Sequence, residues 1–398
     1  MKQRHEKNGT KTDMNQPIIL MILKALEGRG AERMVTTLAR AYVAMDYRVH
    51  VLCLEGTQEM PLDPRVQYHV VPYYETFSKQ EFAPDSEQAS AYRAVAKRID
   101  CYILSHIGMP DLILANIYKI NWIMAYSQLS NIVNVLHTAL SRQFQDLLSD
   151  APKQVIDHLK MVYGSHPCSC VSDGAHQDLL ALVGNSANST NLNRTTTIYN
   201  PCDADEIRKA AAQPLSIEQF GLTDKGYIVH VGSFDTMKGH RDLLQAYAKT
   251  ERKLPLVLVG KGKLEDEMKQ LSIQFSIGDC VHFLGFQANP YPLIATAALM
   301  VLTSKFEGFG YVIVEAQALD VPVISTDCPF GPRELLPESN LIPVGDIDGL
   351  AMLMSQAIEN LNHYKVPLNQ QLLPNCIARQ YLEFGQVLDL GSDITKDY

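Results

Sequence analysis

The chain has 398 residues, which is too long for one ordinary hydrophobic core and about right for two domains. Hydrophobic residues make up 46% and charged residues 20% of it, so disordered and fibrous classes are excluded. The net charge of -9 is unevenly placed: residues 1–200 carry 19 basic and 19 acidic residues, and the rest carry 16 and 25. Neither half has the basic excess of a nucleic-acid-binding protein, and we expect no such partner.

The first elements indicate a parallel sheet. Residues 18–23 are an apolar run, followed by the loop Gly28-Arg29-Gly30 and by apolar residues at helical spacing up to Met45. A second strand is expected at 49–54. This order of strand, loop, helix and strand begins a doubly wound sheet. Further strands are expected at 112–115, 132–136 and 168–172, before a turn at Asn200-Pro201.

A second series of the same kind follows the turn. Its expected strands are 227–231, 256–259, 281–284, 299–302 and 321–325, and its expected helices are 239–250, 263–275, 291–296 and 310–319. The alternation predicts an α/β protein with two tandem Rossmann-like domains. A ligand is expected between them, at the carboxyl ends of the strands.

One segment joins a strand to a helix and carries two acids. Glu307 lies in the glycine-containing loop at the expected helix N-terminus, where N–H groups and the helix dipole favour anions or sugar hydroxyls. Glu315 follows eight residues later, inside the helix, where it can accept from ribose hydroxyls. Gly308 and Gly310 allow the backbone to approach a ligand closely.

Several short motifs occur in a fixed order along nearly the whole chain. They are Gly28 to Arg33, Pro110-Asp111, Val135-Leu136-His137, Asn200-Pro201, Val231-Gly232 with Lys238-Gly239, Leu258 to Gly262, Phe283-Leu284-Gly285, and Glu307 to Glu315 with Pro322. In this order they resemble the retaining GT-B glycosyltransferases, the group that includes bacterial lipopolysaccharide and capsule sugar transferases. The resemblance implies two Rossmann-like domains facing each other across a cleft.

The resemblance also implies roles for particular residues. Lys238 is expected to neutralise the pyrophosphate of a nucleotide-sugar donor, Glu315 to hold its ribose, and the turn from Glu307 to Gly310 to hold the transferred sugar. His137 is expected beside that sugar near the reaction centre. The full expected set is catalytic His137, Lys238 and Glu307, with donor contacts from Gly30, Gly232, Ser233, Lys238, Lys261, Phe286, Gly308, Phe309, Gly310, Glu315 and Arg333.

One position departs from the family pattern. The family usually has an arginine directly after the glycine that matches Gly232, and this chain has Ser233 there. Arg241, Lys261 and Arg29 are the candidates to supply the missing phosphate contact. For Arg241 we prefer the interpretation of a solvated surface charge.

The resemblance implies domain limits as well. We expect a flexible tail at 1–16, an N-terminal acceptor-side domain at 17–200, a C-terminal donor-side domain at 201–375, and a helix at 376–398 that returns to the N-terminal domain. No apolar stretch approaches the roughly 18 residues that a membrane span needs, and the polar first 16 residues lack a signal-peptide core. A cytoplasmic protein is therefore expected, with peripheral contact to the inner face of the membrane as one option.

The expected function is transfer of a hexose or N-acetylhexosamine, preferably from a UDP-sugar, to a glycan or lipid-linked glycan acceptor. No Asp-x-Asp motif on a loop after an expected strand suggests a divalent metal, so neither a metal nor another cofactor is expected. Three alternatives stay open: a GT-B-shaped nucleotide-sugar epimerase, a catalytically silent sugar-binding protein, and a nicotinamide-dependent dehydrogenase. The dehydrogenase fits least well, because Arg33 occupies the third glycine position of the dinucleotide fingerprint.

A membrane-facing surface is the last sequence-based hypothesis. Arg93, Lys97 and Arg98 lie within six residues on an expected helix and can share one face with Tyr92 and Tyr102. An ordinary solvated helix face is the competing interpretation.

Overall fold

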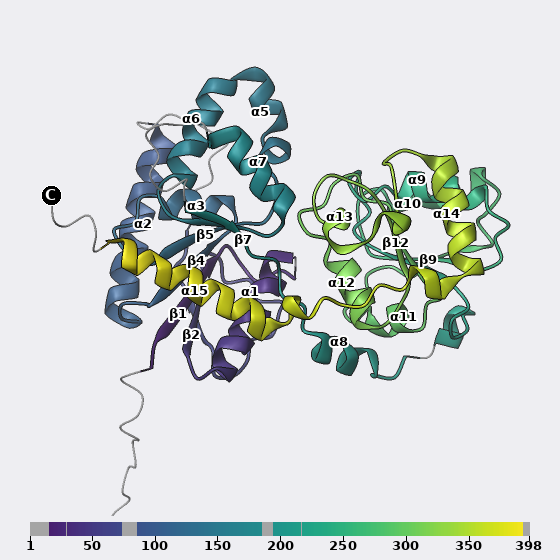
Figure 1. The fold of residues 1–398 in the computed structure, drawn as a ribbon, viewed down its shortest axis with the longest axis horizontal. Coiled ribbons are helices and arrows are strands. Elements are labelled where there is room, and N and C mark those ends of the chain that lie inside the picture. The colour runs from purple at the N-terminus through teal and green to yellow at the C-terminus, as the bar shows by residue number, and fades with distance from the viewer. Residues whose placement is uncertain (1–15, 29, 74–85, 185–193, 216, 393–398) are drawn as a thin grey trace, which may run out of the picture.

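The computed structural model describes residues 16–28, 30–73, 86–184, 194–215 and 217–392. Most of the expected tail, the candidate Arg29 and the last six residues lie outside these ranges. The described chain forms two lobes that lie side by side (Figure 1).

The N-terminal lobe is built on one seven-stranded parallel sheet in the order β3-β2-β1-β4-β5-β6-β7. Helices cover both faces of this sheet, so its central strands are buried apolar runs. Its elements are β1 (Ile18–Leu23), α1 (Gly30–Ala44), β2 (Arg48–Cys53), β3 (Gln67–Val70), α2 (Glu87–His106), β4 (Leu112–Asn116), α3 (Tyr118–Met124), β5 (Ile132–Leu136), α4 (Leu140–Gln143), α5 (Gln145–Asp150), α6 (Pro152–Tyr163), β6 (Cys168–Cys170), α7 (Asp173–Val183) and β7 (Thr195–Thr197).

The C-terminal lobe has a six-stranded parallel sheet in the order β10-β9-β8-β11-β12-β13. It has apolar clusters of its own on both sides. Its elements are α8 (Ala204–Ala211), β8 (Ile228–Val231), α9 (His240–Ala248), β9 (Leu256–Val259), α10 (Glu265–Gln274), β10 (Val281–Phe283), α11 (Tyr291–Ala295), β11 (Leu299–Leu302), α12 (Tyr311–Ala318), β12 (Val323–Thr326), α13 (Pro332–Leu335), β13 (Leu341–Ile342) and α14 (Ile347–Glu359), and the chain then continues to α15 (Pro374–Ser392). The predicted fold class is confirmed.

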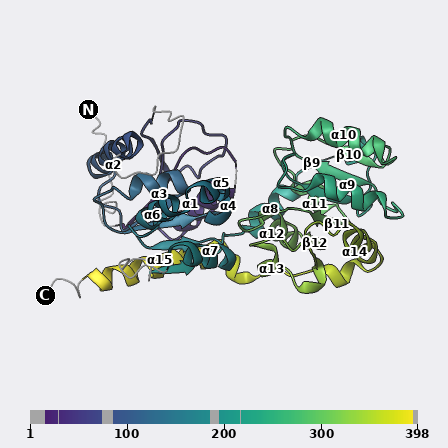
Figure 2. The same cartoon turned by 90° about the horizontal axis from the view of Figure 1, so that it is seen from above.

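The last helix crosses back to the first lobe. In both views α15, drawn in yellow, leaves the C-terminal lobe and lies along the N-terminal one (Figures 1 and 2). Tyr42 of α1 donates through its hydroxyl to the carbonyl of Ala378 at 3.2 Å, and Ser169 of β6 donates to the hydroxyl of Tyr381 at 3.2 Å. Since Tyr381 is fully buried, α15 is part of the core of the N-terminal lobe.

The hypothesis about the face of α2 is partly wrong. Arg93, Lys97 and Arg98 are exposed. Tyr92 instead lies in the core, only 3% exposed, with its ring 4.5 Å from that of Trp122. Tyr92 belongs to the buried side of an amphipathic helix and cannot join an exposed basic face.

Candidate functional site

The two sheets place their site loops at equivalent points. Each strand order reverses direction once, between β1 and β4 in the first sheet and between β8 and β11 in the second. In doubly wound sheets the crevice beyond the strand ends at such a reversal is the place for ligands. Residues 232–239 follow β8 and residues 303–310 follow β11, so most predicted site residues come from the two loops of one reversal point.

Lys238 and Glu307 meet across these two loops. The Lys238 ammonium donates to Oε1 of Glu307 at 2.5 Å, and the Ser304 hydroxyl donates to the same oxygen at 2.6 Å. Their side chains are 24% and 12% exposed, so most of the pair is buried. The arrangement gives one cation and one hydrogen-bond acceptor side by side.

Backbone contacts hold the two loops against each other. Thr303 donates through its hydroxyl to the carbonyl of Lys238 at 3.0 Å, and the N–H of Lys305 donates to the carbonyl of Met237 at 2.7 Å. Gly239 has φ +66°, and a Cβ there would lie 1.9 Å from the carbonyl oxygen of Thr303. Only glycine allows this close approach, which fixes the start of α9 directly behind Lys238.

Ser233 takes a structural part in its loop. Its hydroxyl donates to Oδ2 of Asp235 at 2.5 Å, while Oδ1 of Asp235 accepts from the N–H of Met237 at 2.8 Å. Ser233 lines the cleft but supplies no charge to it. Arg241 does not replace the missing arginine in this arrangement, because its guanidinium pairs with Glu267 on the half-exposed surface.

Glu315 is bound by a residue that the sequence analysis did not assign to the site. Its Oε1 accepts from a guanidinium N–H of Arg33, which lies in the first turn of α1 on the opposite lobe, and from the hydroxyl of Tyr291 at 3.3 Å. The carboxylate raises the pKa of Arg33. Glu315 is only 2% exposed, and its Oε2 has no hydrogen-bond partner among the described residues. Arg33 ends the Gly28-to-Arg33 motif, and that was the signal available for it.

A cavity of about 620 Å³ separates the two lobes at this level. Lys261 and Phe286 form one end of it, with the ammonium 4.7 Å from the ring centroid. The Phe286 ring is 62% exposed, so a flat group can stack against it. The cavity is lined by Glu27, Gly28, Arg33, Thr57, Glu59, Val231, Gly232, Ser233, Val259, Gly260, Lys261, Phe286, Gln287 and Pro290.

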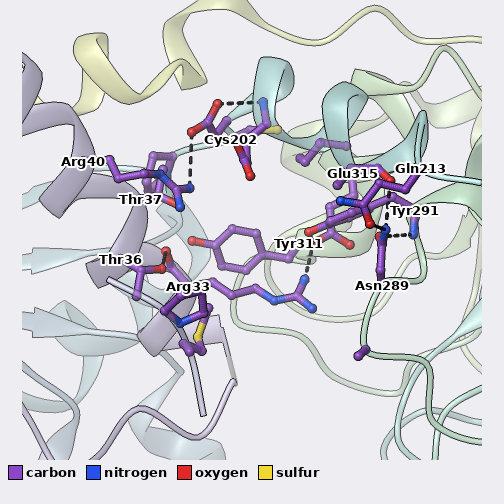
Figure 3. Close-up of a pocket in the computed structure, with 18 residues that line it drawn as sticks. Arg33, Thr36, Thr37, Arg40, Cys202, Gln213, Asn289, Tyr291, Tyr311 and Glu315 are labelled. Carbon is purple, nitrogen blue, oxygen red and sulfur yellow. Dashed lines mark hydrogen bonds and ion pairs between the residues drawn. The ribbon is translucent and has the colours of Figure 1, made fainter. Parts of the chain in front are cut away.

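Arg33 also lines a second cavity, of about 400 Å³ (Figure 3). Glu315 and Tyr311 line it from α12, and Arg40 lines it from α1. Figure 3 shows Arg33 reaching from α1 to Glu315, beside the ring of Tyr311. Arg33 therefore lines both cavities.

His137 follows the end of β5 and lies beside the turn from Glu307 to Gly310. One ring nitrogen, Nε2, lies 3.0 Å from Oδ1 of Asn116, whose amide donates to two backbone carbonyls. The network therefore makes Nε2 the protonated nitrogen and leaves Nδ1 as an acceptor. Burial lowers the pKa of His137 to about 4, so the ring is neutral at physiological pH.

The turn from Glu307 to Gly310 touches the N-terminal lobe directly. A Cβ on Gly308 would lie 2.2 Å from the carbonyl oxygen of His137, and one on Gly30 would lie 3.4 Å from the ring of Tyr311. Gly310 has φ +93° and begins α12. The side chain of Phe309 is 3% exposed and packs in the core, so only its backbone faces the cleft.

Arg333 is not brought to this site. Its side chain is 76% exposed, its Nε donates to Asp327 at 3.0 Å, and it lines neither cavity. The next residue crosses to the other lobe instead: Glu334 accepts from the N–H groups of Asp173 and Gly174 at 2.7 and 3.0 Å. Both groups belong to the N-terminus of α7, where a carboxylate is favoured.

The described residues contain neither a metal-binding cluster nor a membrane-spanning helix. No cluster of three or more His, Cys, Asp or Glu side chains in the described ranges could hold a metal ion. Among the helices described, none combines the length and the apolar character needed to cross a bilayer.

Comparison with known proteins gives two consecutive family matches. Residues 28–206 match the model "Glycosyltransferase Family 4", and residues 213–370 match the model "Glycosyl transferases group 1". A 4-alpha-N-acetylgalactosaminyltransferase of Campylobacter jejuni, whose name includes a diphospho-undecaprenol glycan, is 34% identical over 38% of this chain and 40% of its own length. The N-acetyl-alpha-D-glucosaminyl L-malate synthase of Bacillus anthracis is 29% identical over 77% of both chains.

Several curated relatives are matched over only 38 to 42% of their length. Among solved structures, Anabaena HepE in complex with UDP has a TM-score of 0.66 and 19% identity, over 95% of this chain and all of that one. This likeness shows the GT-B fold. Through both of its domains, the chain therefore belongs to the glycosyltransferases, with a family 4 domain followed by a group 1 domain.

Proposed function

We propose that this chain transfers a hexose or N-acetylhexosamine, with retention, from a UDP-sugar to a glycan or lipid-linked glycan. The observation that carries the proposal is the pair of Lys238 and Glu307 at one strand-order reversal, beside a cavity that Gly232 and Ser233 of the same loop line together with residues of the other lobe. The names of the relatives support a glycan acceptor, and the UDP complex of the Anabaena neighbour supports the choice of nucleotide.

The donor's parts fit the cleft in a definite order. The diphosphate pairs with Lys238, and the transferred sugar lies against the turn from Glu307 to Gly310. The ribose hydroxyls reach Glu315, whose Oε2 is buried without a partner among the described residues. The base enters the end of the 620 Å³ cavity formed by Lys261 and Phe286.

The reaction needs no protein nucleophile in this geometry. The bond from the anomeric carbon to the phosphate oxygen breaks, and its electron pair leaves with the diphosphate, where Lys238 stabilises the developing charge. The acceptor hydroxyl then bonds to the anomeric carbon on the same face, and its proton passes to the departing phosphate oxygen. No divalent metal is required, because Lys238 and helix N-termini supply the positive charge.

His137 contributes a neutral hydrogen-bonding ring beside the transferred sugar. Its Nε2–H is held by Asn116, so its Nδ1 is the atom that can accept from a sugar hydroxyl. A neutral ring adds no positive charge next to an oxocarbenium-like centre, which a protonated imidazole would destabilise.

Slow hydrolysis of a panel of nucleotide sugars tests this function without knowledge of the acceptor. Purified protein should release UDP from one UDP-sugar, with the same rate in EDTA as in magnesium or manganese. Loss of activity in EDTA and recovery with either metal would contradict the metal-free mechanism. Conversion of the donor into an isomeric nucleotide sugar would instead identify an epimerase.

We further propose that the exposed face of α2 makes a peripheral contact with anionic lipid. Lys97 and Leu104, which is 55% exposed, lie on the outer side of this helix. Such attachment weakens with salt, because the Debye length falls from about 10 Å at 0.1 M to about 3 Å at 1 M. Equal sedimentation of wild type and the Arg93, Lys97, Arg98 triple alanine variant with anionic vesicles would rule this face out.

A further inference from the structure

The cleft holds a cation from the N-terminal lobe that can meet a diphosphate. Ser233 leaves the C-terminal lobe with no charge at the position beside Gly232, and Arg241 is paired elsewhere on the surface. Arg33 lines the same cavity as Gly232 and Ser233, although it comes from α1 on the opposite side. It lies in the first turn of a 15-residue helix, whose N-terminus also favours anions.

In the described state, Lys238 and Arg33 are each neutralised by a carboxylate. Lys238 is paired with Glu307, and Arg33 is paired with Glu315. The two acids are the groups expected to hold the transferred sugar and the ribose. A diphosphate that enters the cleft therefore competes with two glutamates, while the sugar and ribose hydroxyls that arrive with it are the natural new partners of those glutamates.

The position of Arg33 makes this exchange specific. Glu315 lines only the second cavity, whereas Arg33 lines both. Arg33 and Tyr291 both bind Oε1 of Glu315, so a ribose hydroxyl that takes this oxygen replaces one of them. The Arg33 side chain is 32% exposed and has room to turn.

We propose that Arg33 is the second diphosphate-binding cation of this site, exchanging Glu315 for the donor when the donor binds. This inference rests on the proposed function. The ribose takes Glu315 and the guanidinium turns toward the phosphates, which suit its planar, bidentate donors. Because Arg33 belongs to the N-terminal lobe and Glu315 and Lys238 to the C-terminal lobe, the exchange also couples donor binding to the position of the two lobes.

Paired titrations of UDP and uridine separate the phosphate contact from the ribose and base contacts. Arg33→Ala should weaken UDP binding about tenfold or more, because a charge-assisted contact is lost, and should leave uridine binding unchanged. Arg33→Lys should recover part of the loss, since it keeps the charge without the bidentate geometry. Glu315→Gln should weaken both ligands equally.

Arg40→Ala is the matched control. Arg40 lies on the same helix, is 35% exposed, and pairs with Asp203 of the other lobe at 3.3 Å, but it lines only the second cavity. Its loss removes one ion pair between the lobes and should leave the ratio of UDP to uridine affinity unchanged. Similar thermal unfolding midpoints for the two alanine variants show that both fold.

The outcomes distinguish the two proposals. If wild type binds UDP and Arg33→Ala weakens UDP and uridine equally, or neither, Arg33 is not a diphosphate contact while the donor site stands. If wild type binds none of UDP, GDP and ADP, the proposed function itself is contradicted, and the role of Arg33 with it.

Discussion

Two glutamates eight residues apart are each held by a cation from a different part of the chain. Glu307 is bound by Lys238 from the neighbouring loop, and Glu315 by Arg33 from the other lobe. The sequence predicted the first three of these residues through the order of motifs. It did not predict the contact between Arg33 and Glu315, because that pair spans 282 positions and depends on how the lobes meet.

Glycines in the site loops were easier to predict from the sequence than the direction of a long side chain. Glycines whose Cβ would strike backbone, such as Gly239 and Gly308, were marked by their place between strand and helix. Arg333 was placed near the donor by resemblance, but its side chain bends out to Asp327. The orientation of a long, exposed side chain depends on local partners that a motif does not encode.

Loss of the Lys238 charge should weaken donor binding. Lys238→Ala is expected to reduce UDP-sugar affinity about tenfold to a hundredfold, since a hydrogen bond to a charged group contributes about 1.5–3 kcal/mol. Calorimetric titration measures the change. Lys305→Ala is the control, because Lys305 lies in the adjoining loop but pairs with Asp242 at 3.7 Å. Equal affinities in all three proteins would remove Lys238 from the site.

At the scale of elements, apolar runs predicted the central strands closely. The expected strands 18–23, 132–136, 256–259 and 299–302 have the observed bounds. Three edge strands were not predicted: β3 reads Gln-Tyr-His-Val and is half exposed, β7 reads Thr-Thr-Thr and is half-buried, and β13 has two residues. An edge strand buries little surface, so its sequence carries a weak periodic signal.

The turn at Gly308 depends on the absence of a side chain. Gly308→Ala should push this turn away from His137, because the new Cβ would lie 2.2 Å from a backbone carbonyl oxygen. We expect lower turnover with nearly unchanged UDP affinity, since the sugar side of the site moves and the base side does not. Gly56→Ala is the control, with no atom within 4 Å of its Cβ. Full turnover in Gly308→Ala would contradict the close fit of this turn.

At the scale of the whole molecule, the lobes are joined by polar contacts and by the returning helix. Glu334 caps α7, Arg40 pairs with Asp203, and α15 lies in the core of the N-terminal lobe. Two parallel sheets in tandem were predictable from the repeating order of strands and helices. The mutual placement of the lobes was not, because it rests on contacts between residues far apart in the chain.

Buried histidines should make the molecule acid-sensitive. Burial lowers the pKa of His50, His137, His158 and His230 to about 4, and that of His240 to about 2. Below about pH 6.5 the unfolded chain takes up protons that the folded chain does not. Each site then lowers the free energy of unfolding by up to about 1.4 kcal/mol per pH unit as the pH falls from about 6.5 to 4.

Denaturant unfolding at pH 7.5, 6.5 and 5.5 measures this dependence. His50 is the site to replace, because it lies in β2, remote from the cleft. His50→Asn should reduce the slope, and His363→Gln, at an exposed position, should leave it unchanged. A free energy of unfolding that stays constant over this range would show that the folded and unfolded chains bind equal numbers of protons, and would contradict the lowered pKa values of these histidines.

A crystal structure of the protein with bound UDP tests the central claim most directly. We expect UDP between the two lobes, with the base in the 620 Å³ cavity against Lys261 and Phe286, the ribose hydroxyls on Glu315, and the diphosphate on Lys238. Arg33 should then have left Glu315 for the phosphates. UDP bound outside this cleft, or inside it with the ribose away from Glu315, would contradict the account.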